Sequence, residues 1–371
     1  MCFLNQKVYY INFGNSNDCS KNAGAKAPND IYTICKNEGM IEIKSPIFPA
    51  KKNRIYQKIW ALSIYSKWWR RLVNIFHDRD VIIFQYPMHL GPKISFRMLP
   101  YVKKNTGCKY VAIVHDLNSL RNGKNEFYRA DIEKSKTIEN NWLSKFDVLI
   151  CHNEHMKKYL VDQGFDNTRL VNLEIFDYLT SSKIREREKN KFPSIAIAGN
   201  LIFSKSSYIY KIIDNKNDRN TNLKIHLYGV NYDQSKAEKN MSYHGSFTPE
   251  ELPEYLEGDF GLVWDGYSTE TCTGITGEYL KYNNPHKTSL YLSAGMPVIV
   301  WRKAAIADFV IENGVGIVVD SLLELDKTIE SVSEKEYKKM CENAYIIAKK
   351  LRSGYYFKKA LSKSVDIVNT F

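Results

Sequence analysis

Nine short apolar runs recur along the chain, and most of them are separated by stretches long enough for a helix. Each run is five to eight residues long, which suits a buried strand. Strands that alternate with helices pair in parallel, so the pattern predicts an α/β fold with doubly wound sheets. The runs occupy residues 7–13, 80–86, 109–116, 147–153, 194–200, 223–229, 259–266, 297–301 and 315–320.

A charged segment divides the nine runs into two series. Residues 181–191 hold Ile184 as their single apolar residue, which is typical of a linker between domains. The length of 371 residues also favours two domains, because a single core rarely grows beyond roughly 250–300 residues. We therefore predict two α/β domains in tandem, 1–185 and 186–350, followed by a helical C-terminus.

One predicted helix, between residues 284 and 295, has residues at both ends that are typical of helix termini. Asn284 is expected to cap it, Pro285 to take its first position and Gly295 to end it. His286 and Lys287 stand in its first turn, where positive charge is unfavourable unless an anion binds there too. We interpret this end as a diphosphate site. The alternative is a structural helix whose Lys287 points to solvent.

Two other segments follow strands and carry glycine. Gly199 permits close approach of a ligand to the backbone, and Lys205 is near enough in sequence to reach the same phosphates. The loop within residues 260–277, with Gly274 and Gly277, is placed to wrap a sugar nucleotide. The competing interpretations are an ordinary turn and a surface loop.

The first series offers candidates for acid–base chemistry. His115 and Asp116 end a predicted strand, and ligands of parallel sheets bind at the carboxyl ends of strands. Either side chain is suited to deprotonate an acceptor hydroxyl. In the alternative, Asp116 caps a helix and His115 is structural. The long polar loop at residues 14–30 is a further functional candidate.

No metal site is expected. The sequence has no DxD pair where a metal–diphosphate site needs it, no HExxH and no P-loop. A leaving diphosphate is then neutralised by helix amides together with Lys205 and Lys287. No cofactor is predicted.

The net charge of +12 calls for an anionic partner, such as a phosphorylated substrate or an anionic membrane surface, although solubility alone also explains it. Residues 51–71 mix Lys and Arg with three Trp residues, as membrane-interface helices do; the alternative is a partly buried helix. Seven scattered cysteines, and no recognisable signal or membrane-spanning segment, lead us to expect a cytoplasmic protein, peripheral at the inner face of the membrane.

The residues from the strand at 259–266 through the helix after Asn284 resemble the C-terminal signature of bacterial galactofuranosyltransferase-like proteins. That group includes the glucosyltransferases that extend O-linked GlcNAc on streptococcal adhesins. Segments after residues 13, 110 and 150 are also similar to that group, and the resemblance runs from about residue 5 to residue 320. It implies a GT-B fold, with a cleft between two Rossmann-like domains and a C-terminal helix, 351–371, that returns to the first domain.

The resemblance also implies a UDP-sugar donor, bound mainly by the second domain, and a glycan acceptor. The acceptor side would be lined by residues 14–26 and 115–121. The implied donor residues are Asn284, Pro285, His286, Lys287, Thr288 and Ser289 at the diphosphate and ribose, Gly199, Asn200 and Lys205 facing them, and Tyr228 and Gly229 near the uracil.

The preferred hypothesis is transfer of a hexose, galactofuranose or glucose, from a UDP-sugar to a glycan on a lipid or a glycoprotein. A non-catalytic nucleotide-sugar-binding subunit is the alternative, and a homo-oligomer is compatible with either. A dehydrogenase is disfavoured because no GxGxxG follows a strand, and no nucleic-acid-binding module is recognisable.

Overall fold

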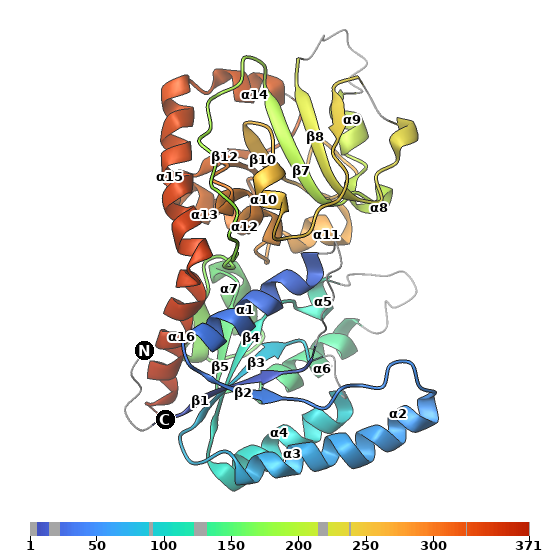
Figure 1. Cartoon of the computed structure of the whole chain (residues 1–371), viewed down its shortest axis with the longest axis vertical. Coiled ribbons are helices and arrows are strands. Elements are labelled where there is room, and N and C mark those ends of the chain that lie inside the picture. The colour runs from blue at the N-terminus through green and yellow to red at the C-terminus, as the bar shows by residue number, and fades with distance from the viewer. Residues whose placement is uncertain are drawn as a thin grey trace.

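The structure is a computed structural model that describes residues 6–14, 23–88, 92–121, 132–213, 222–236, 239–323 and 325–370. Two α/β domains are stacked along the long axis of the molecule (Figure 1). Each domain is built on a sheet of six parallel strands, as the alternation of apolar runs predicts. Parallel sheets are covered by helices on both faces, which is why their strands are apolar on both sides.

The N-terminal sheet has the strand order β2-β1-β3-β4-β5-β6. Its strands are β1 (Val8–Asn12), β2 (Ile41–Lys44), β3 (Val81–Tyr86), β4 (Lys109–Val114), β5 (Val148–Cys151) and β6 (Leu170–Asn172). Its helices are α1 (Lys26–Asn37), α2 (Arg54–Trp60), the π-helical η2 (Ala61–Tyr65), α3 (Ser66–Arg71), α4 (Pro92–Thr106), α5 (Asn118–Arg121), α6 (Ile132–Leu143) and α7 (Glu154–Asp162).

Alternate residues of β3 show how this sheet is covered. Ile82 and Phe84 pack in one apolar cluster with Trp69 of α3 and Leu99 of α4. The opposite face of the same strand joins a second cluster that contains α1 and the C-terminal helix. Successive side chains of a strand point to opposite faces, so each helix layer has its own core.

The C-terminal sheet has the order β12-β11-β10-β7-β8-β9. Its strands are β7 (Ser194–Asn200), β8 (Lys224–Val230), β9 (Met241–Tyr243), β10 (Phe260–Val263), β11 (Val298–Trp301) and β12 (Gly316–Val319). Its helices are α8 (Phe203–Ser206), α9 (Ile209–Ile213), α10 (Leu252–Tyr255), α11 (Gly274–Tyr279), α12 (His286–Ser293), α13 (Ile306–Asn313), α14 (Leu325–Ser331) and α15 (Glu334–Arg352).

The chain crosses between the two sheets twice. The first crossing is the segment 173–193, which has no helix or strand between β6 and β7. The second is the short turn between α15 and α16 (Tyr355–Val368), and α16 packs against β5 and β6 of the N-terminal sheet. The Asp177 carboxylate of the first crossing accepts hydrogen bonds from the backbone N–H groups of Tyr356 and Phe357, at 3.1 and 2.7 Å. The two crossings are therefore fastened to each other at the start of α16.

Three strands were not predicted from the sequence: β2, β6 and β9. Each lies at an edge of its sheet and is only three or four residues long. No helix among the described residues is long and apolar enough to cross a bilayer.

Candidate functional site

The predicted anion site lies at the carboxyl end of the C-terminal sheet, where α12 begins. Pro285 precedes the helix with extended backbone angles, and Gly295 follows it with a left-handed φ of +69°. The first turn of an α-helix presents N–H groups that no carbonyl of the helix accepts. Asp265, just after β10, contacts Lys287 in this turn and also lies close to Lys205, which follows β7, so residues that are far apart in the sequence meet there.

Asp265, just after β10, joins the two predicted lysines. Its carboxylate accepts a hydrogen bond from Lys287 Nζ at 2.8 Å and lies 3.5 Å from Lys205 Nζ. Lys287 also donates to the Trp264 carbonyl at 3.0 Å, and its side chain is only 17% exposed. Lys287 therefore does not point to solvent, and Asp265 supplies the negative charge that its place at a helix N-terminus requires.

Two ammonium groups share this one carboxylate, so the cluster keeps a net positive charge. The Asp265 charge raises the pKa of Lys205, but burial and the charges of Lys287 and Arg121 outweigh it and leave that pKa lowered. Arg121 belongs to the N-terminal domain, so the positive charge of both domains acts at this place. A cluster with surplus positive charge beside a helix N-terminus is suited to bind a diphosphate.

Two paired glycines form the neighbouring strand ends. Gly199 and Gly229 are opposite each other on β7 and β8, with φ values of +130° and +138°. A Cβ on Gly229 would lie 1.8 Å from the Gly199 carbonyl oxygen, whereas a Cβ on Gly199 would meet no atom within 4 Å. The backbone of Gly199 is thus open to a ligand, while Gly229 is required for the close approach of the two strands.

The predicted uracil and ribose residues are placed differently from one another. The exposed Asn200 side chain accepts hydrogen bonds from Ile202 N–H and from Asn231. The Tyr228 side chain is fully buried, and its hydroxyl is bonded to the backbone of residues 255 and 257. Only the backbone of Tyr228 can meet a ligand. Thr288 is buried, and its hydroxyl has no hydrogen-bond partner among the described residues.

Two residues of the predicted donor set, Asn284 and Ser289, bind the N-terminal half of the chain instead. Asn284 does not cap α12, contrary to the sequence-based expectation, because its side chain bonds Asn153 at 2.7 Å and the carbonyls of His152 and Glu174. The Ser289 hydroxyl donates to the carbonyl of residue 176 at 2.7 Å. These contacts fix the start of α12 against the end of β5 and the first crossing.

His286 is likewise directed inward. It is half-buried beside the rings of Phe176 and Tyr178, with Nε2 out of contact with solvent, and the loss of solvation lowers the pKa of its imidazole to about 3. The ring is therefore neutral at neutral pH. Of the two possible cations in the first turn, Lys287 alone carries charge.

The acceptor-side candidates stand at the end of β4, next to the C-terminal domain. Here Leu117 N–H donates to the Tyr279 hydroxyl of α11 at 3.0 Å. His115 Nε2 lies 2.6 Å from Gln85 Oε1, and the Gln85 amide nitrogen donates to the Pro28 carbonyl at 3.1 Å. A carbonyl only accepts, so Gln85 must turn its oxygen toward His115, and Nε2 of His115 must carry the proton. Nδ1 is then the basic nitrogen of His115.

The neighbouring Asp116 is paired with Arg121 in an ion pair. An ion pair stabilises the charged form of a carboxylate and so makes it a weaker base. Of the two predicted candidates, His115 is thus better prepared to accept a proton.

Phe176 gathers three imidazoles, a feature that the sequence did not reveal. Its ring stacks on His115 at 5.4 Å, meets His152 edge-on at 4.8 Å and lies 6.1 Å from His286. The three histidines come from β4, from the end of β5 and from α12. No periodic pattern links them, so only the fold brings them together.

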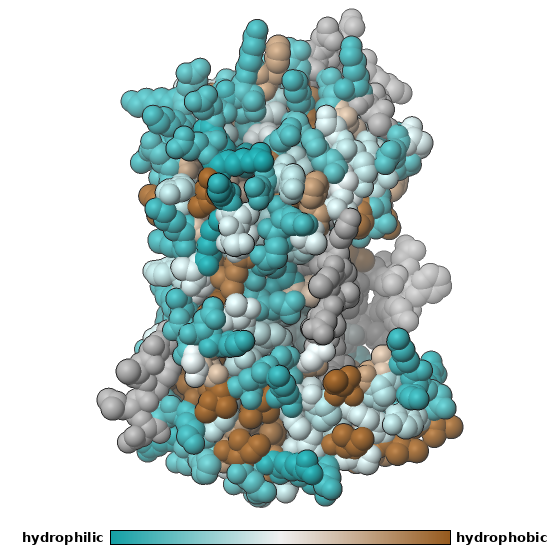
Figure 2. All heavy atoms as spheres, in the orientation of Figure 1, coloured by the Kyte–Doolittle hydropathy of each residue, from teal (hydrophilic) through white to brown (hydrophobic). Residues whose placement is uncertain are grey.

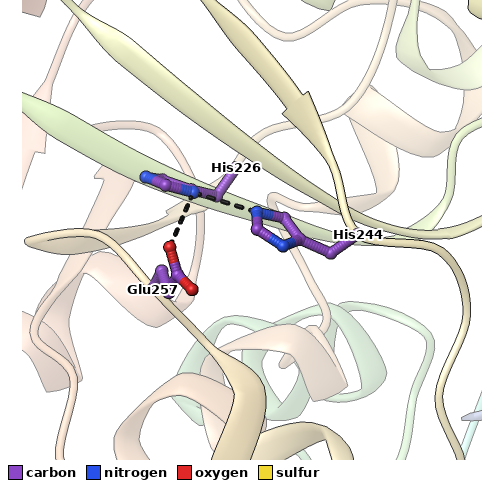
Figure 3. Close-up of side chains that lie close together, drawn as sticks. All are labelled: His226, His244 and Glu257. Atoms are coloured by element: carbon purple, nitrogen blue, oxygen red, sulfur yellow. Dashed lines mark hydrogen bonds and ion pairs between the residues drawn. The ribbon is translucent and has the colours of Figure 1, made fainter.

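One other cluster has the geometry of a metal site: His226, His244 and Glu257 (Figure 3). His226 Nδ1 lies 3.0 Å from His244 Nε2 and 3.4 Å from Glu257 Oε2, near the roughly 3.3 Å that separates ligands in a tetrahedral zinc site. However, the cavity beside it has no surplus of negative charge to hold a cation. Its charged lining residues are Arg185, Arg187, Lys191 and Lys224 together with Glu186, Glu188 and Glu257. The ring of His244 stacks on that of Tyr228 at 4.7 Å, so this cluster lies against the buried side chain of one residue of the predicted donor set.

Comparison with known proteins identifies the family. Residues 8–175 match the description "Glucosyltransferase 3-like, N-terminal domain", and residues 195–364 match "Glucosyltransferase 3-like, C-terminal domain". The chain belongs to this family. The family resemblance noted in the sequence is thereby confirmed.

The matched region spans most or all of the length of each relative. The β-1,6-galactofuranosyltransferase WbbI of Escherichia coli K12 is 34% identical over 98% of this chain and all of its own. Glucosyltransferase 3 of Streptococcus gordonii is 27% identical over 77% of this chain and 79% of its own.

Solved structures confirm the GT-B fold. The lipopolysaccharide outer core galactosyltransferase WaaB superposes with a TM-score of 0.58 at 13% identity, over 99% of this chain and all of its own. Anabaena Alr3699/HepE, solved with UDP, has a TM-score of 0.54 at 12% identity over 98% and 99% of the two chains. Family and fold together make this Glucosyltransferase 3-like protein a glycosyltransferase.

Proposed function

We propose that this protein transfers a hexose from a UDP-sugar to a hydroxyl of a glycan acceptor. The observation that carries the proposal is the cluster of Lys205, Asp265 and Lys287 at the N-terminus of α12. Its surplus positive charge is placed where a nucleoside diphosphate would depart. A leaving diphosphate gains negative charge in the transition state, and preorganised donors stabilise it there.

The donor we favour is UDP-galactofuranose, with UDP-glucose as the alternative. The full-length relative at 34% identity is a galactofuranosyltransferase, whereas the 27% identical relative is a glucosyltransferase. The acceptor glycan is carried on a lipid or on a glycoprotein, and the reaction takes place in the cytoplasm at the inner face of the membrane.

His115 is proposed as the general base. Its Nδ1 is the basic nitrogen because Nε2–H donates a hydrogen bond to Gln85, and Gln85 is itself oriented by its hydrogen bond to the Pro28 carbonyl. The acceptor hydroxyl gives its proton to Nδ1 as its oxygen bonds to the anomeric carbon, and the bond from that carbon to the diphosphate oxygen breaks. Asp116 acts as a positioning residue through Arg121.

No metal ion is required in this proposal. Lys205, Lys287 and the amides of α12 supply the positive charge that a divalent cation supplies elsewhere.

Calorimetry tests the donor site. UDP, UDP-galactofuranose and UDP-glucose are titrated with EDTA into the wild type, Lys287→Met and Lys281→Met. Lys281 is the matched control, because it is a lysine six positions away that pairs with Glu278 on the surface. We expect binding that persists in EDTA, survives in Lys281→Met and falls at least tenfold in Lys287→Met. Equal binding by all three proteins would remove the basis of the proposal.

Turnover separates an enzyme from a non-catalytic subunit. UDP release from the preferred donor is measured for the wild type and for His115→Ala. Loss of a general base reduces the rate by about 10²–10⁴, and His115→Ala should leave UDP affinity unchanged. Donor binding without UDP release, with or without acceptor glycans, would favour the non-catalytic subunit.

A further inference from the structure

The segment 45–76 of the N-terminal domain has an unusual charge balance. It contains no Asp or Glu and seven basic residues: Lys51, Lys52, Arg54, Lys58, Lys67, Arg70 and Arg71. All seven are exposed. The net charge of the whole chain is +12, so a large part of its surplus is concentrated on this one stretch, well away in sequence from the donor site.

The same stretch forms one continuous helix, α2–η2–α3, whose orientation is fixed by aromatic packing. Trp60, Tyr65 and Trp69 are its buried residues, with Tyr65 stacked on Trp60 at 5.5 Å and bonded to Ser95 of α4 at 2.8 Å. Residues five apart in an α-helix differ by about 140° in direction. The π-helical turn η2 reduces this angle, so that Trp60 and Tyr65 both face the domain.

The opposite face of this helix is apolar and open. Ile55, Ile59 and Leu62 follow the spacing i, i+4, i+7, which places them on one side of a helix. Their side chains are 72%, 60% and 74% exposed, and Ile47 in the preceding loop is 86% exposed. Figure 2 shows apolar side chains gathered at the lower end of the molecule, where Figure 1 places α2 and α3.

We propose that the α2–η2–α3 face, defined by Ile55, Ile59 and Leu62 with the basic residues around them, docks on the surface of an anionic lipid bilayer. Amphipathic helices that lie in a membrane interface combine an apolar face, basic flanks and Trp, and they need both the apolar and the charged component. Acidic lipid headgroups complement a segment without a single carboxylate.

Other occupants fit the face less well. Nucleic acid is bound through its phosphates by basic residues, and a row of isoleucine and leucine side chains adds nothing to that electrostatic attraction. A second copy of this segment would bring seven positive charges against seven, which opposes a symmetric dimer. A bilayer of acidic lipids binds both the apolar and the basic side chains of this face.

The docking has a consequence for the acceptor. The face belongs to the domain that carries His115, so a glycan on a lipid would be presented to the domain that holds the proposed base. Docking itself does not depend on the proposed function, because binding to vesicles needs neither donor nor acceptor.

Vesicle co-sedimentation tests the proposal with the full chain. Vesicles of phosphatidylglycerol and phosphatidylcholine are compared with vesicles of phosphatidylcholine alone. We expect binding to the anionic vesicles only, and replacement of Lys58 and Lys67 by Gln should weaken it roughly thirty-fold at low salt. The triple change of Ile55, Ile59 and Leu62 to Ser should weaken it about a hundredfold.

Matched controls lie on the C-terminal domain. Ile311 and Ile346 have similar exposure, 58% and 54%, and their replacement by Ser should leave vesicle binding unchanged. Lys335 and Lys338, changed to Gln, control for charge. The replaced side chains are exposed, so thermal unfolding and UDP affinity should match the wild type. If the triple variant does not fold, the loss of binding in the lysine variants and the weakening of vesicle binding by salt still test the proposal.

Several results would overturn the proposal. They are absence of wild-type binding to anionic vesicles at low salt, equal weakening by the control variants, and a dimer that the Ser variant dissociates. Retention of duplex DNA that depends on Lys58 and Lys67 but not on the apolar residues would identify a nucleic-acid surface instead.

Discussion

Asp265 offers a perturbation that separates holding the two lysines from binding the donor. In the unliganded protein its carboxylate is 2.8 Å from Lys287 and 3.5 Å from Lys205, so the three charges sum to +1. Asp265→Asn raises the sum to +2, and Lys287→Met lowers it to 0. A diphosphate competes with Asp265 for the same ammonium groups. We therefore expect UDP affinity to increase in the order Lys287→Met, wild type, Asp265→Asn.

The size of these effects follows from charge and exposure. A unit charge about 5 Å from a phosphate contributes roughly 3 kcal/mol at an effective dielectric constant of 20. Solvent reaches the site, because the Lys205 side chain is 34% exposed, and we expect screening to halve this value. Each substitution should then change UDP affinity by about tenfold. Stability should fall in both variants by about 2–3 kcal/mol, somewhat below the loss for a fully buried pair.

Calorimetry with UDP and thermal unfolding with and without UDP measure both quantities. Asp265→Asn should have a lower unfolding temperature than the wild type without UDP and a larger increase on adding it. A folded Asp265→Asn protein that binds UDP as weakly as Lys287→Met would refute the reasoning. The carboxylate would then be needed to hold the lysines in place, and charge competition would be irrelevant.

Three further predictions concern backbone, protonation and domain contact. Gly229→Ala should destabilise the protein by about 3 kcal/mol or more in chemical unfolding, because its Cβ would meet a carbonyl at 1.8 Å, whereas Gly199→Ala should lose only about 1–2 kcal/mol from backbone strain. His286 has a folded-state pKa of about 3, below the 6.5 of the unfolded chain, so the unfolded state takes up the proton and stability is lost as pH falls from about 6.5 toward 3. The pH dependence of unfolding should be shallower in His286→Phe by about 1.4 kcal/mol per pH unit in this range, and an identical slope would contradict a neutral buried imidazole. Asn284→Ala should reduce stability by about 2–4 kcal/mol because it leaves buried partners unbonded, while Asn283→Ala, whose amide oxygen has no hydrogen-bond partner among the described residues, serves as the neighbouring control.

Much of the fold follows from the sequence because buried parallel strands are apolar on both faces. Each of the nine predicted runs overlaps a strand, and β7 has the predicted limits. The strands that escaped prediction, β2, β6 and β9, are edge strands with one neighbour each. In β2 and β9 every residue is at least partly exposed. Apolar residues are therefore not required there, and the sequence has no continuous apolar run at either strand.

The site was predictable only where local chemistry marks it. Gly295 follows the end of α12 in the predicted left-handed conformation, whereas Pro285 stands one residue before the helix and not at its first position. The pairing of Lys287 with Asp265 is not local, since it depends on β10 and β11 being neighbours in the sheet. The side chain of Asn284 suits helix capping, and the sequence therefore predicts that role. In the structure its contact with Asn153 of the other domain outweighs this local preference.

The two crossings between the domains also determine how the molecule is threaded. Residues 6–14 and 355–370 belong to the same domain, and Gln6 donates a hydrogen bond to the Asn369 side chain at 2.9 Å. In effect the C-terminal domain is an insertion joined to the N-terminal domain by two chain segments, one near Asp177 and one near Tyr356, and its other contacts with that domain are non-covalent. A domain joined to another by two adjacent chain segments moves mainly by rotation about the line through those two segments. Opening and closing over a donor therefore has one main degree of freedom, and a circularly permuted chain with new ends in a surface loop should keep it.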